Sequence, residues 1–286
     1  MKKIDIVVAV CNEEDLIRPF VDSLRQLHLP AEIDLGIIFV EDSSTDRTRD
    51  VLREVCATGS SVRFYSLERG YGQAPALWFG MQRSNADAVI TMDVDQGHPV
   101  SVIPSMIEAW LSGADIVQGV RMDISGRPAY RDAGTRAFDL MVKVVTGVDL
   151  RRQNVHFRLL TKAAKDEFLN NQRWIYFLRY HFPANQYSRQ YIEFTSQERT
   201  AGCSKFDFRK LLAHSLRGIL SIIPAKRFLF IMLPALFAAL VLGILVHWLI
   251  ACILLLPVLI VIECYRRMCK NQISDRMRIV EQSECQ

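Results

Sequence analysis

Two aspartates with one residue between them, Asp93 and Asp95, directly follow the apolar run AVITM at residues 88–92. Carboxylate oxygens are the hard ligands that Mg²⁺ and Mn²⁺ prefer, and either ion can neutralise the charge of a diphosphate. A D-x-D pair alone is weak support for a metal site, because the same residues also occur in solvated loops. Their place directly after a predicted buried strand favours a divalent-metal site with Asp93 and Asp95 as ligands.

The elements that must position these aspartates follow from the hydrophobic pattern of residues 4–120. Short β-rich apolar runs alternate there with helix-like stretches, and the runs read IDIVVAV, DLGIIFV, VRFYSL, DAVITMDV and DIVQGV. This alternation predicts an α/β fold with a parallel sheet and crossover helices. Loops after such strands lie at the carboxyl edge of the sheet, where open α/β folds bind ligands. We therefore expect the polar segments that begin at Cys11, Glu41 and Asp93 to converge.

The amino-acid composition excludes several classes of protein. The chain has 286 residues, of which 50% are hydrophobic, and a formal net charge of +4, which excludes a disordered or collagen-like chain. The 7 cysteines are odd in number and lack a C-x-x-C pair, so they predict neither a disulfide framework nor a zinc site and fit a reducing, cytosolic setting. The charge is modest and no nucleic-acid-binding motif accompanies it, so we expect no nucleic acid as a partner.

The C-terminal part is predicted to enter a membrane. Residues Phe228 to Ile262 include no Asp, Glu, Lys or Arg, and the apolar stretch 228–265 is about twice the ~20 residues that one helical span needs. Two transmembrane helices fit this length, and basic residues at both flanks predict that both ends stay cytoplasmic. The alternative, a pair of buried core helices, is less favoured because so long a charge-free run is rare in soluble folds. The basic, amphipathic segment 206–227 is expected on the anionic membrane surface, and 266–286 as a cytoplasmic tail.

Seven motifs in a defined order carry a family resemblance. They are V-A-V-C-N-E-E (8–14), E-D-S-S-T-D-R-T (41–48), R-G-Y-G-Q (69–73), M-D-V-D-Q-G-H-P (92–99), G-V-R (119–121), F-R-L-L (157–160) and R-T-A-G-C-S-K-F (199–206). This order resembles the family-2 glycosyltransferases of GT-A fold, and among them the polyprenyl-phosphate hexosyltransferases such as dolichol-phosphate mannose synthase. The resemblance implies a Rossmann-like GT-A domain over 1–205, followed by the two-helix transmembrane hairpin. It further implies an inverting, metal-dependent enzyme at the cytoplasmic face of the inner membrane, with a UDP- or GDP-sugar as donor and polyprenyl phosphate as acceptor.

The resemblance also implies roles for residues on the donor side. Asn12, Glu13 and Asp42 would line the nucleotide pocket, with Asp42 near the ribose or base. Asp93 and Asp95 would hold Mg²⁺ or Mn²⁺ and, through it, the donor diphosphate. Asp42 has an alternative as the N-cap of the helix that follows, a common role for aspartate.

On the acceptor side, the resemblance assigns basic residues to the phosphates. Arg131 and Thr135 match an Arg-and-Ser pair that grips the acceptor phosphate in the family, while Arg121, Arg199 and Lys205 would add positive charge around both phosphate groups. Without the resemblance, Arg131 would equally be an ordinary surface cation. The membrane hairpin could also associate with copies of itself, because small residues near Gly243 permit close helix contact.

Three departures from the family pattern leave alternatives open. Cys11 replaces a tyrosine, Gln96-Gly97 replaces Leu-Gln, and His156 stands where an aspartate precedes F-R-L-L. His156 is therefore a candidate base with a pKa near neutrality, or a hydrogen-bond donor to a phosphate, or a structural residue. The alternative functions are a catalytically impaired scaffold that binds nucleotide-sugar and a transferase for another lipid or glycan acceptor.

Overall fold

The structure is a computed structural model of the chain. It describes residues 1–58, 61–95, 97–122, 140, 156–170, 187–195, 233–234, 236–241, 255–263 and 266, together with the backbone of 279–284. The strands are β1 (Lys2–Val10), β2 (Ile33–Glu41), β3 (Val62–Leu67), β4 (Ala88–Met92), β5 (Ile116–Arg121), β6 (Arg158–Thr161), β7 (Arg189–Phe194) and β8 (Ile279–Glu284). The helices are α1 (Ile17–Arg25), α2 (Thr48–Thr58), α3 (Gln73–Gln82), α4 (Ile103–Leu111) and α6 (Lys162–Asn170), with the short 3-10 turn η1 (Val100–Val102) before α4.

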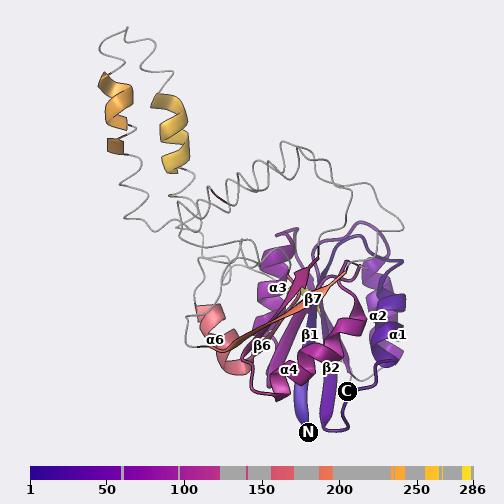
Figure 1. Ribbon diagram of the computed structural model, residues 1–286. Coiled ribbons are helices and arrows are strands. Elements are labelled where there is room, and N and C mark those ends of the chain that lie inside the picture. Colours follow the sequence, from indigo (N-terminus) through magenta and orange to yellow (C-terminus); the bar gives the residue numbers. More distant parts are fainter. Residues whose placement is uncertain are drawn as a thin grey trace.

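All the described strands join one mixed sheet in the order β7-β5-β6-β4-β1-β2-β3-β8 (Figure 1). The central strand β1 pairs in parallel with both β2 and β4, so that Val8 lies opposite Phe39 on one side and Met92 on the other. β2 pairs in parallel with β3. The carboxyl ends of these four strands therefore lie at one edge of the sheet.

Helices cover both faces of the sheet and produce two hydrophobic cores (Figure 1). One core joins α1, α2 and α4 to the face of β1 that carries Ile4, Ile6 and Val8. The other joins α3 and α6 to the opposite face, where Val7 lies. Because both faces of the central strands are buried, their sequences are almost continuously apolar rather than alternating.

The five strands expected within residues 4–120 are confirmed, and they all run in the same direction. Two other strands make the sheet mixed where the pattern predicted a parallel one. β6 lies between β4 and β5 and is antiparallel to both, and β8 pairs antiparallel with the edge strand β3. A four-residue strand is too short to show a period, and β8 lies in a polar tail, so neither carries a hydrophobic signal.

Within the described segments, none of the helices combines the length and apolar character that a membrane span requires. The hairpin predicted over 228–265 lies mostly outside those segments and stays a prediction. Cys11 and Cys56, the two cysteines in the described part of the chain, form no disulfide.

The close approach of α3 to the sheet depends on Gly80. A Cβ at this position would lie 2.4 Å from Cγ1 of Val7 and 2.9 Å from Cγ2 of Val40. Both neighbours are branched side chains on central strands, so they have little freedom to move.

We expect Gly80→Ala to lower the free energy of unfolding by about 1 kcal/mol, because overpacking of about 1–3 kcal/mol outweighs a gain of at most about 1 kcal/mol in helix propensity. Urea unfolding followed by tryptophan fluorescence measures the change. Gly70→Ala is the matched control, since a Cβ there meets its nearest atom at an ordinary 3.9 Å. A Gly80→Ala variant as stable as the wild type would contradict this packing.

Candidate active site

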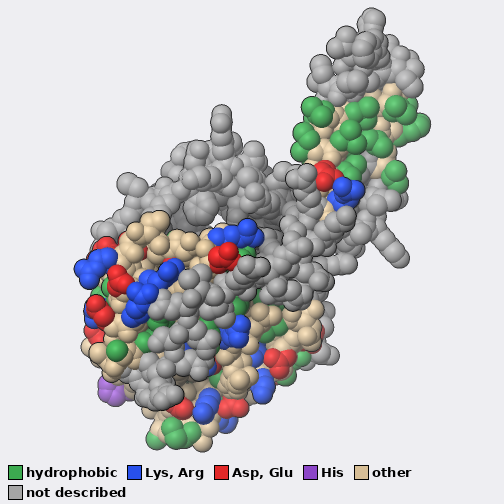
Figure 2. Space-filling view, turned by 180° about the vertical axis from the view of Figure 1, so that it is seen from behind, with side chains coloured by type: hydrophobic (Ala, Val, Ile, Leu, Met, Phe, Trp, Pro, Cys, Tyr) green, Lys and Arg blue, Asp and Glu red, His purple; other side chains and the backbone are tan. Residues whose placement is uncertain are grey.

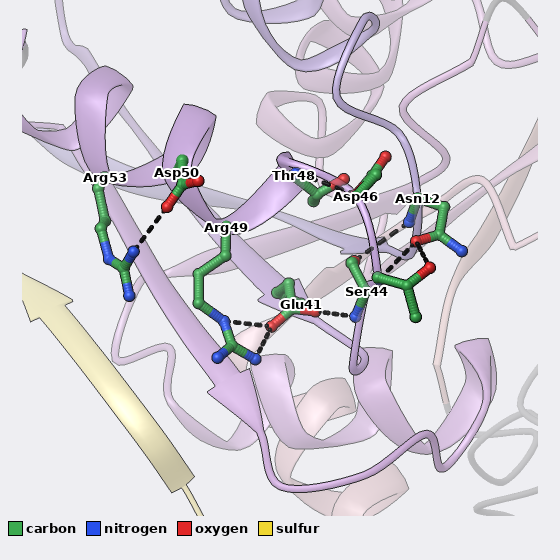
Figure 3. Close-up of polar contacts among 9 residues, drawn as sticks. Asn12, Glu41, Ser44, Asp46, Thr48, Arg49, Asp50 and Arg53 are labelled. Atoms are coloured by element: carbon green, nitrogen blue, oxygen red, sulfur yellow. Dashed lines mark hydrogen bonds and ion pairs between the residues drawn. The ribbon is translucent and has the colours of Figure 1, made fainter.

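The loops after β1 and β2 are joined through Asn12, the second residue after β1 (Figure 3). Its Oδ1 accepts hydrogen bonds from the backbone N–H of Thr45 at 2.8 Å and from the Thr45 hydroxyl at 3.2 Å. The backbone N–H of Asn12 donates in return to Oγ of Ser44 at 3.1 Å. Asn12 therefore lies at the predicted edge of the sheet, and its side chain holds the two loops together.

Glu13 and Glu14 add further connections between the same loops. The backbone N–H of Glu13 donates to Oγ1 of Thr48 at 2.9 Å, and the Glu14 carboxylate accepts the N–H of Arg47 at 3.0 Å. Asp46 accepts the N–H groups of Glu14 at 3.4 Å and of Thr48 at 3.0 Å, and so satisfies an N–H at the start of α2. Desolvation raises the pKa of Asp46, but hydrogen bonds from Thr48 and from backbone N–H groups outweigh it and leave the pKa below its ordinary value.

Glu41, the last residue of β2, is a fully buried carboxylate. Its Oε2 accepts from Nε and Nη2 of Arg49 at 3.2 and 2.9 Å, and its Oε1 accepts from the backbone N–H of Ser44 (Figure 3). A paired cation and hydrogen bonds replace the hydration that a buried charge loses. Glu41 thus ties the β2–α2 loop to the first turn of α2.

Asp42 connects the second loop to the third. Its Oδ1 accepts the N–H of Tyr71 at 2.8 Å and its Oδ2 the N–H of Gly72 at 2.7 Å. Burial raises the pKa of Asp42 above its ordinary value of 3.8; the two hydrogen bonds offset part of the rise, and the negative charge of Glu41 adds to it. Gly72 has a φ of 96°, a conformation that glycine adopts without strain. Asp42 therefore fixes the turn from which α3 begins.

Asp93 and Asp95 lie on the loop after β4, as predicted. Oδ1 of Asp93 accepts a hydrogen bond from Nε2 of Gln73, the first residue of α3. Oδ1 of Asp95 accepts the N–H of Gly97 at 3.0 Å. A Cβ on Gly97 would lie 2.7 Å from that same oxygen, so glycine leaves room for the Asp95 carboxylate. The hydrogen bond between Gln73 and Asp93 joins the third loop to the fourth.

The two aspartates suit a metal ion that completes its shell with ligand oxygens. Over the described ranges, no three or more His, Cys, Asp or Glu side chains are grouped to hold a metal by themselves. Mg²⁺ is commonly bound by one or two carboxylates together with substrate phosphates and water. The carboxylates of Asp93 and Asp95 fit that kind of site.

Positive charge reaches this loop from β5. Arg121 is the last residue of β5, and its Nη2 donates to the carbonyl oxygen of Gly97 at 3.4 Å. Its guanidinium therefore lies against the loop of Asp93 and Asp95, where a cation can contact phosphate oxygens. The position is the one the sequence predicted, and the phosphate contact stays a prediction.

His156 reaches the same region because β6 is antiparallel to β4. The register pairs Thr91 with Arg158, and its continuation by two residues sets Asp93 against His156. The carbonyl oxygen of His156 accepts a hydrogen bond from Oγ1 of Thr91 at 2.5 Å, and the residue is buried. A buried histidine beside the D-x-D loop agrees with each of the three roles considered for it.

The remaining predicted residues of the acceptor side lie outside the described residues, and their roles stay predictions: Arg131, Thr135, Arg199 and Lys205.

The N-cap alternative for Asp42 is not what the structure shows, because Asp46 accepts the N–H of Thr48 and Asp42 binds the third loop. Sequence reasoning gave Gln73 no role, although it ends the R-G-Y-G-Q motif. Its polar side chain at the end of that motif, where a helix begins, was the feature of the sequence that could have indicated this role.

Comparison with known proteins decides the family. The model of the family described as "Glycosyl transferase family 2" matches residues 5–173. The chain belongs to this family. Among curated relatives, the bactoprenol glucosyl transferase of Shigella phage SfV is 30% identical over 219 residues, or 77% of this chain and 71% of the relative. The prophage bactoprenol glucosyl transferase homolog of Escherichia coli K12 is 29% identical and covers 77% of this chain and 72% of its own length.

Solved structures of similar fold agree with this assignment. A glucosyl-3-phosphoglycerate synthase from Mycobacterium tuberculosis, in complex with Mn²⁺, UDP-glucose and phosphoglyceric acid, has a TM-score of 0.52 and 17% identity. The match covers 79% of each chain. The described sheet is therefore the mixed α/β sheet of a GT-A-like family 2 glycosyltransferase, and the resemblance read from the seven motifs is confirmed.

The opposite pKa shifts of two loop aspartates predict opposite effects of pH on stability. A raised native pKa means that folded Asp42 binds its proton more tightly than the unfolded chain does, so it adds stability as the pH falls toward 3.8. The native pKa of Asp46 is lowered, so its contribution to stability is present above pH 3.8 and is lost as the pH falls below 3.8 and through the native pKa.

We therefore expect the difference in free energy of unfolding between the wild type and Asp42→Asn to shift in favour of the wild type on acidification from neutral pH. The same difference for Asp46→Asn should shift against the wild type. Urea titrations of the three proteins over a pH series measure both differences. If the two differences moved in the same direction with pH, the environment described for Asp42 would be wrong.

Proposed function

We propose that this family 2 glycosyltransferase transfers a hexose from a nucleotide-sugar to polyprenyl phosphate at the cytoplasmic surface of a membrane. The main supporting observation is that Asp93 and Asp95 lie on the last of four strand-end loops that hydrogen bonds link one to the next. The chain is also 30% identical, over 77% of its length, to a bactoprenol glucosyl transferase. Relatives with this name act on bactoprenol, a polyprenol. The solved structures of similar fold with bound UDP-glucose and Mn²⁺ support a nucleotide-sugar as donor.

In this proposal Asp93 and Asp95 hold Mg²⁺ or Mn²⁺, with the donor diphosphate supplying further oxygens. The bound ion would stabilise the negative charge that develops on the diphosphate leaving group. Gly97 supports this assignment, since any side chain at that position would meet the Asp95 carboxylate. Arg121 adds a fixed positive charge beside the loop.

The residues of the chain mainly have to position the two substrates. A phosphate monoester has a second pKa of about 6, so the acceptor oxygen is already largely ionised at neutral pH. That oxygen forms a bond to the anomeric carbon while the bond from this carbon to the diphosphate breaks, and attack opposite the leaving group inverts the configuration. His156 is buried beside the D-x-D loop and can orient the acceptor phosphate by a hydrogen bond. A strong base is unnecessary for this reaction, so histidine in place of the family's aspartate is compatible with turnover.

Exposed apolar side chains support the membrane part of the proposal. The described helical stretches 236–241 and 255–263 expose Phe237, Leu240, Leu256, Leu259 and Ile260, which are 48–68% accessible. Figure 2 shows hydrophobic side chains gathered on the segment that projects from the domain. Water-exposed apolar surface of this extent is typical of a lipid or protein contact. A lipid contact fits better, because the surrounding sequence from Phe228 to Ile262 has no charged residue.

The pairing of β8 with β3 supports an even number of membrane crossings. Residues 279–284 follow the apolar stretch and return to the sheet of the catalytic domain, where Arg63 is paired with Glu284 and Tyr65 with Gln282. The two ends of the apolar stretch then lie on the same side of the membrane. The proposal therefore keeps the domain order predicted from the sequence, with 1–205 catalytic, 206–227 on the membrane surface, 228–265 as the hairpin and 266–286 as the tail. Within that tail, residues 279–284 form β8 of the sheet.

The function is tested by transfer of radiolabelled sugar from a panel of UDP- and GDP-sugars to undecaprenyl and dolichyl phosphate in membranes that contain the protein. We expect labelled lipid with at least one donor, loss of product with EDTA, and recovery with Mg²⁺ or Mn²⁺. Asp95→Asn should reduce the rate by about 10²-fold or more, because it removes charge that holds the metal. Asp34→Asn, an exposed aspartate at the opposite end of β2, is the control and should leave the rate unchanged.

The alternatives predict other outcomes of the same assay. Folded protein that yields no labelled lipid with any donor would contradict the proposal and favour another acceptor or a nucleotide-sugar-binding scaffold. Product formation that resists EDTA and Asp95→Asn would contradict the metal site alone.

Membrane topology is tested with reporters fused after Gln286 or, in a truncated chain, after His247. We expect green fluorescent protein to fluoresce and alkaline phosphatase to be inactive at the C-terminus, with the reverse after His247. Active phosphatase after Gln286 would contradict the even number of crossings.

A further inference from the structure

His98 is a buried histidine next to the D-x-D loop for which the proposed reaction gives no role. It is 4% exposed, and its Nδ1 accepts a hydrogen bond from the backbone N–H of Asp93 at 2.8 Å. An imidazole that accepts at Nδ1 carries its proton on Nε2. The backbone N–H of His98 donates to the carbonyl oxygen of Asp95 at 3.3 Å. His98 therefore stabilises the conformation of the D-x-D loop through hydrogen bonds to the backbone of both predicted metal ligands.

The ring of His98 is held by two phenylalanines from other strands. It stacks on Phe157, directly before β6, with ring centroids 5.1 Å apart and planes at 19°. It meets Phe194, the last residue of β7, edge-on at 6.1 Å, and the two phenylalanines contact each other at 5.5 Å. Such aromatic contacts fix the position of a ring more closely than apolar packing alone. The three rings thus connect the D-x-D loop to β6 and β7, the strands that flank β5 in the sheet.

Gly119 leaves the space that this aromatic cluster occupies. A Cβ there would lie 3.0 Å from Cε1 of Phe194 and 3.1 Å from Cδ1 and from the carbonyl oxygen of Phe157. Because one of these neighbours is backbone and the others are packed rings, a side chain at 119 would displace the cluster. Gly119 belongs to the G-V-R motif that ends in Arg121. The glycine of this motif leaves room for the aromatic rings, and its arginine is the cation beside the D-x-D loop.

Asp93 has a second point of attachment on its side chain. Gln73 donates to Oδ1 of Asp93, and Oδ2 of Asp93 lies 3.7 Å from Nδ1 of His98. The backbone of Asp93 is therefore held by His98 and its carboxylate by Gln73. Groups behind a metal ligand commonly set its orientation, and their loss costs about 10–100-fold in metal affinity or activity.

We propose that His98 is a positioning residue for the D-x-D loop. Its imidazole, held by Phe157 and Phe194, orients the backbone of Asp93 so that both aspartates meet the metal and the diphosphate together. This inference rests on the proposed function, because it takes Asp93 and Asp95 as the metal ligands. His98 itself does not contact the substrates in this proposal.

The test is Mn²⁺ binding to the purified full-length chain, followed by electron paramagnetic resonance with UDP or GDP present. We expect His98→Ala to weaken Mn²⁺ binding by about 10-fold or more. His98→Asn should recover most of the loss, since the asparagine Oδ1 can accept the Asp93 N–H in place of Nδ1. Phe157→Leu, which keeps the acceptor but removes the stacked ring, should give an intermediate loss. His28→Ala is the matched control, because His28 is exposed and distant in sequence from the motifs.

A second readout follows the hydrogen bond itself. Hydrogen exchange of the Asp93 amide, measured by mass spectrometry, should accelerate in His98→Ala and return toward the wild-type rate in His98→Asn. If His98→Ala does not fold, the comparison of His98→Asn, Phe157→Leu and wild type decides the question.

The outcomes separate this inference from the proposed function. Wild-type Mn²⁺ binding with unchanged binding and exchange in the His98 and Phe157 variants would overturn the positioning role and leave the function intact. A wild type that binds no Mn²⁺ with either nucleotide would overturn both the metal site and the inference. Equal losses in His98→Ala and His98→Asn would overturn it in favour of a direct contact between imidazole and ligand.

Discussion

The shared direction of β1, β2, β3 and β4 determines where the polar residues of the site lie. Each strand ends at the same edge of the sheet, so each chain reversal places its loop beside the loops of its neighbours. Backbone groups of these loops that packing removes from water need other hydrogen-bond partners. Side chains supply them: Asn12 and Glu14 bind the second loop, Asp42 binds the third, and Gln73 binds the fourth. The site is thus a chain of neighbouring loops, each held by a polar residue of the one beside it.

Some polar residues of these loops hold the loop conformation, and others belong to the proposed metal and phosphate site. Glu41 and Asp42 are adjacent buried carboxylates, and each is engaged by groups of its own loop or the next one. Burying two such acids costs free energy, and the hydrogen bonds that they accept offset that cost. Because these bonds form only in the observed loop conformation, they also stabilise it. These contacts form a fixed support beneath the D-x-D loop. In the proposed function, the metal and the phosphates bind at that loop, beside Arg121 and His156. Preorganised charges lose little free energy to rearrangement when a ligand binds.

The sequence predicted the parts of the structure that carry a strong local signal. Long apolar runs identified β1 to β5, and the polar segments after three of them identified the edge where the loops meet. The short strand β6 gave no periodic signal, although its antiparallel pairing with β4 is what brings His156 to Asp93. Side-chain partners were also beyond reach, because Asp42 and Asp46 look alike in sequence and differ only in which N–H groups the fold presents to them. The family resemblance assigned roles to Asp42, Asp93 and Asp95 on the donor side, and these roles stay predictions. Contacts such as those of Gln73 and His98 needed the three-dimensional arrangement.

In the proposed reaction, Asp93 and Asp95 hold a divalent metal ion and, through it, the donor diphosphate. Anomalous diffraction at the manganese edge, from crystals of the chain with Mn²⁺ and the diphosphate UDP or GDP, tests it most directly. We expect one strong anomalous peak within coordination distance, about 2 Å, of an Asp93 or Asp95 oxygen and of a diphosphate oxygen. A diphosphate bound elsewhere, or bound at this edge with the manganese ligated by other side chains, would contradict it.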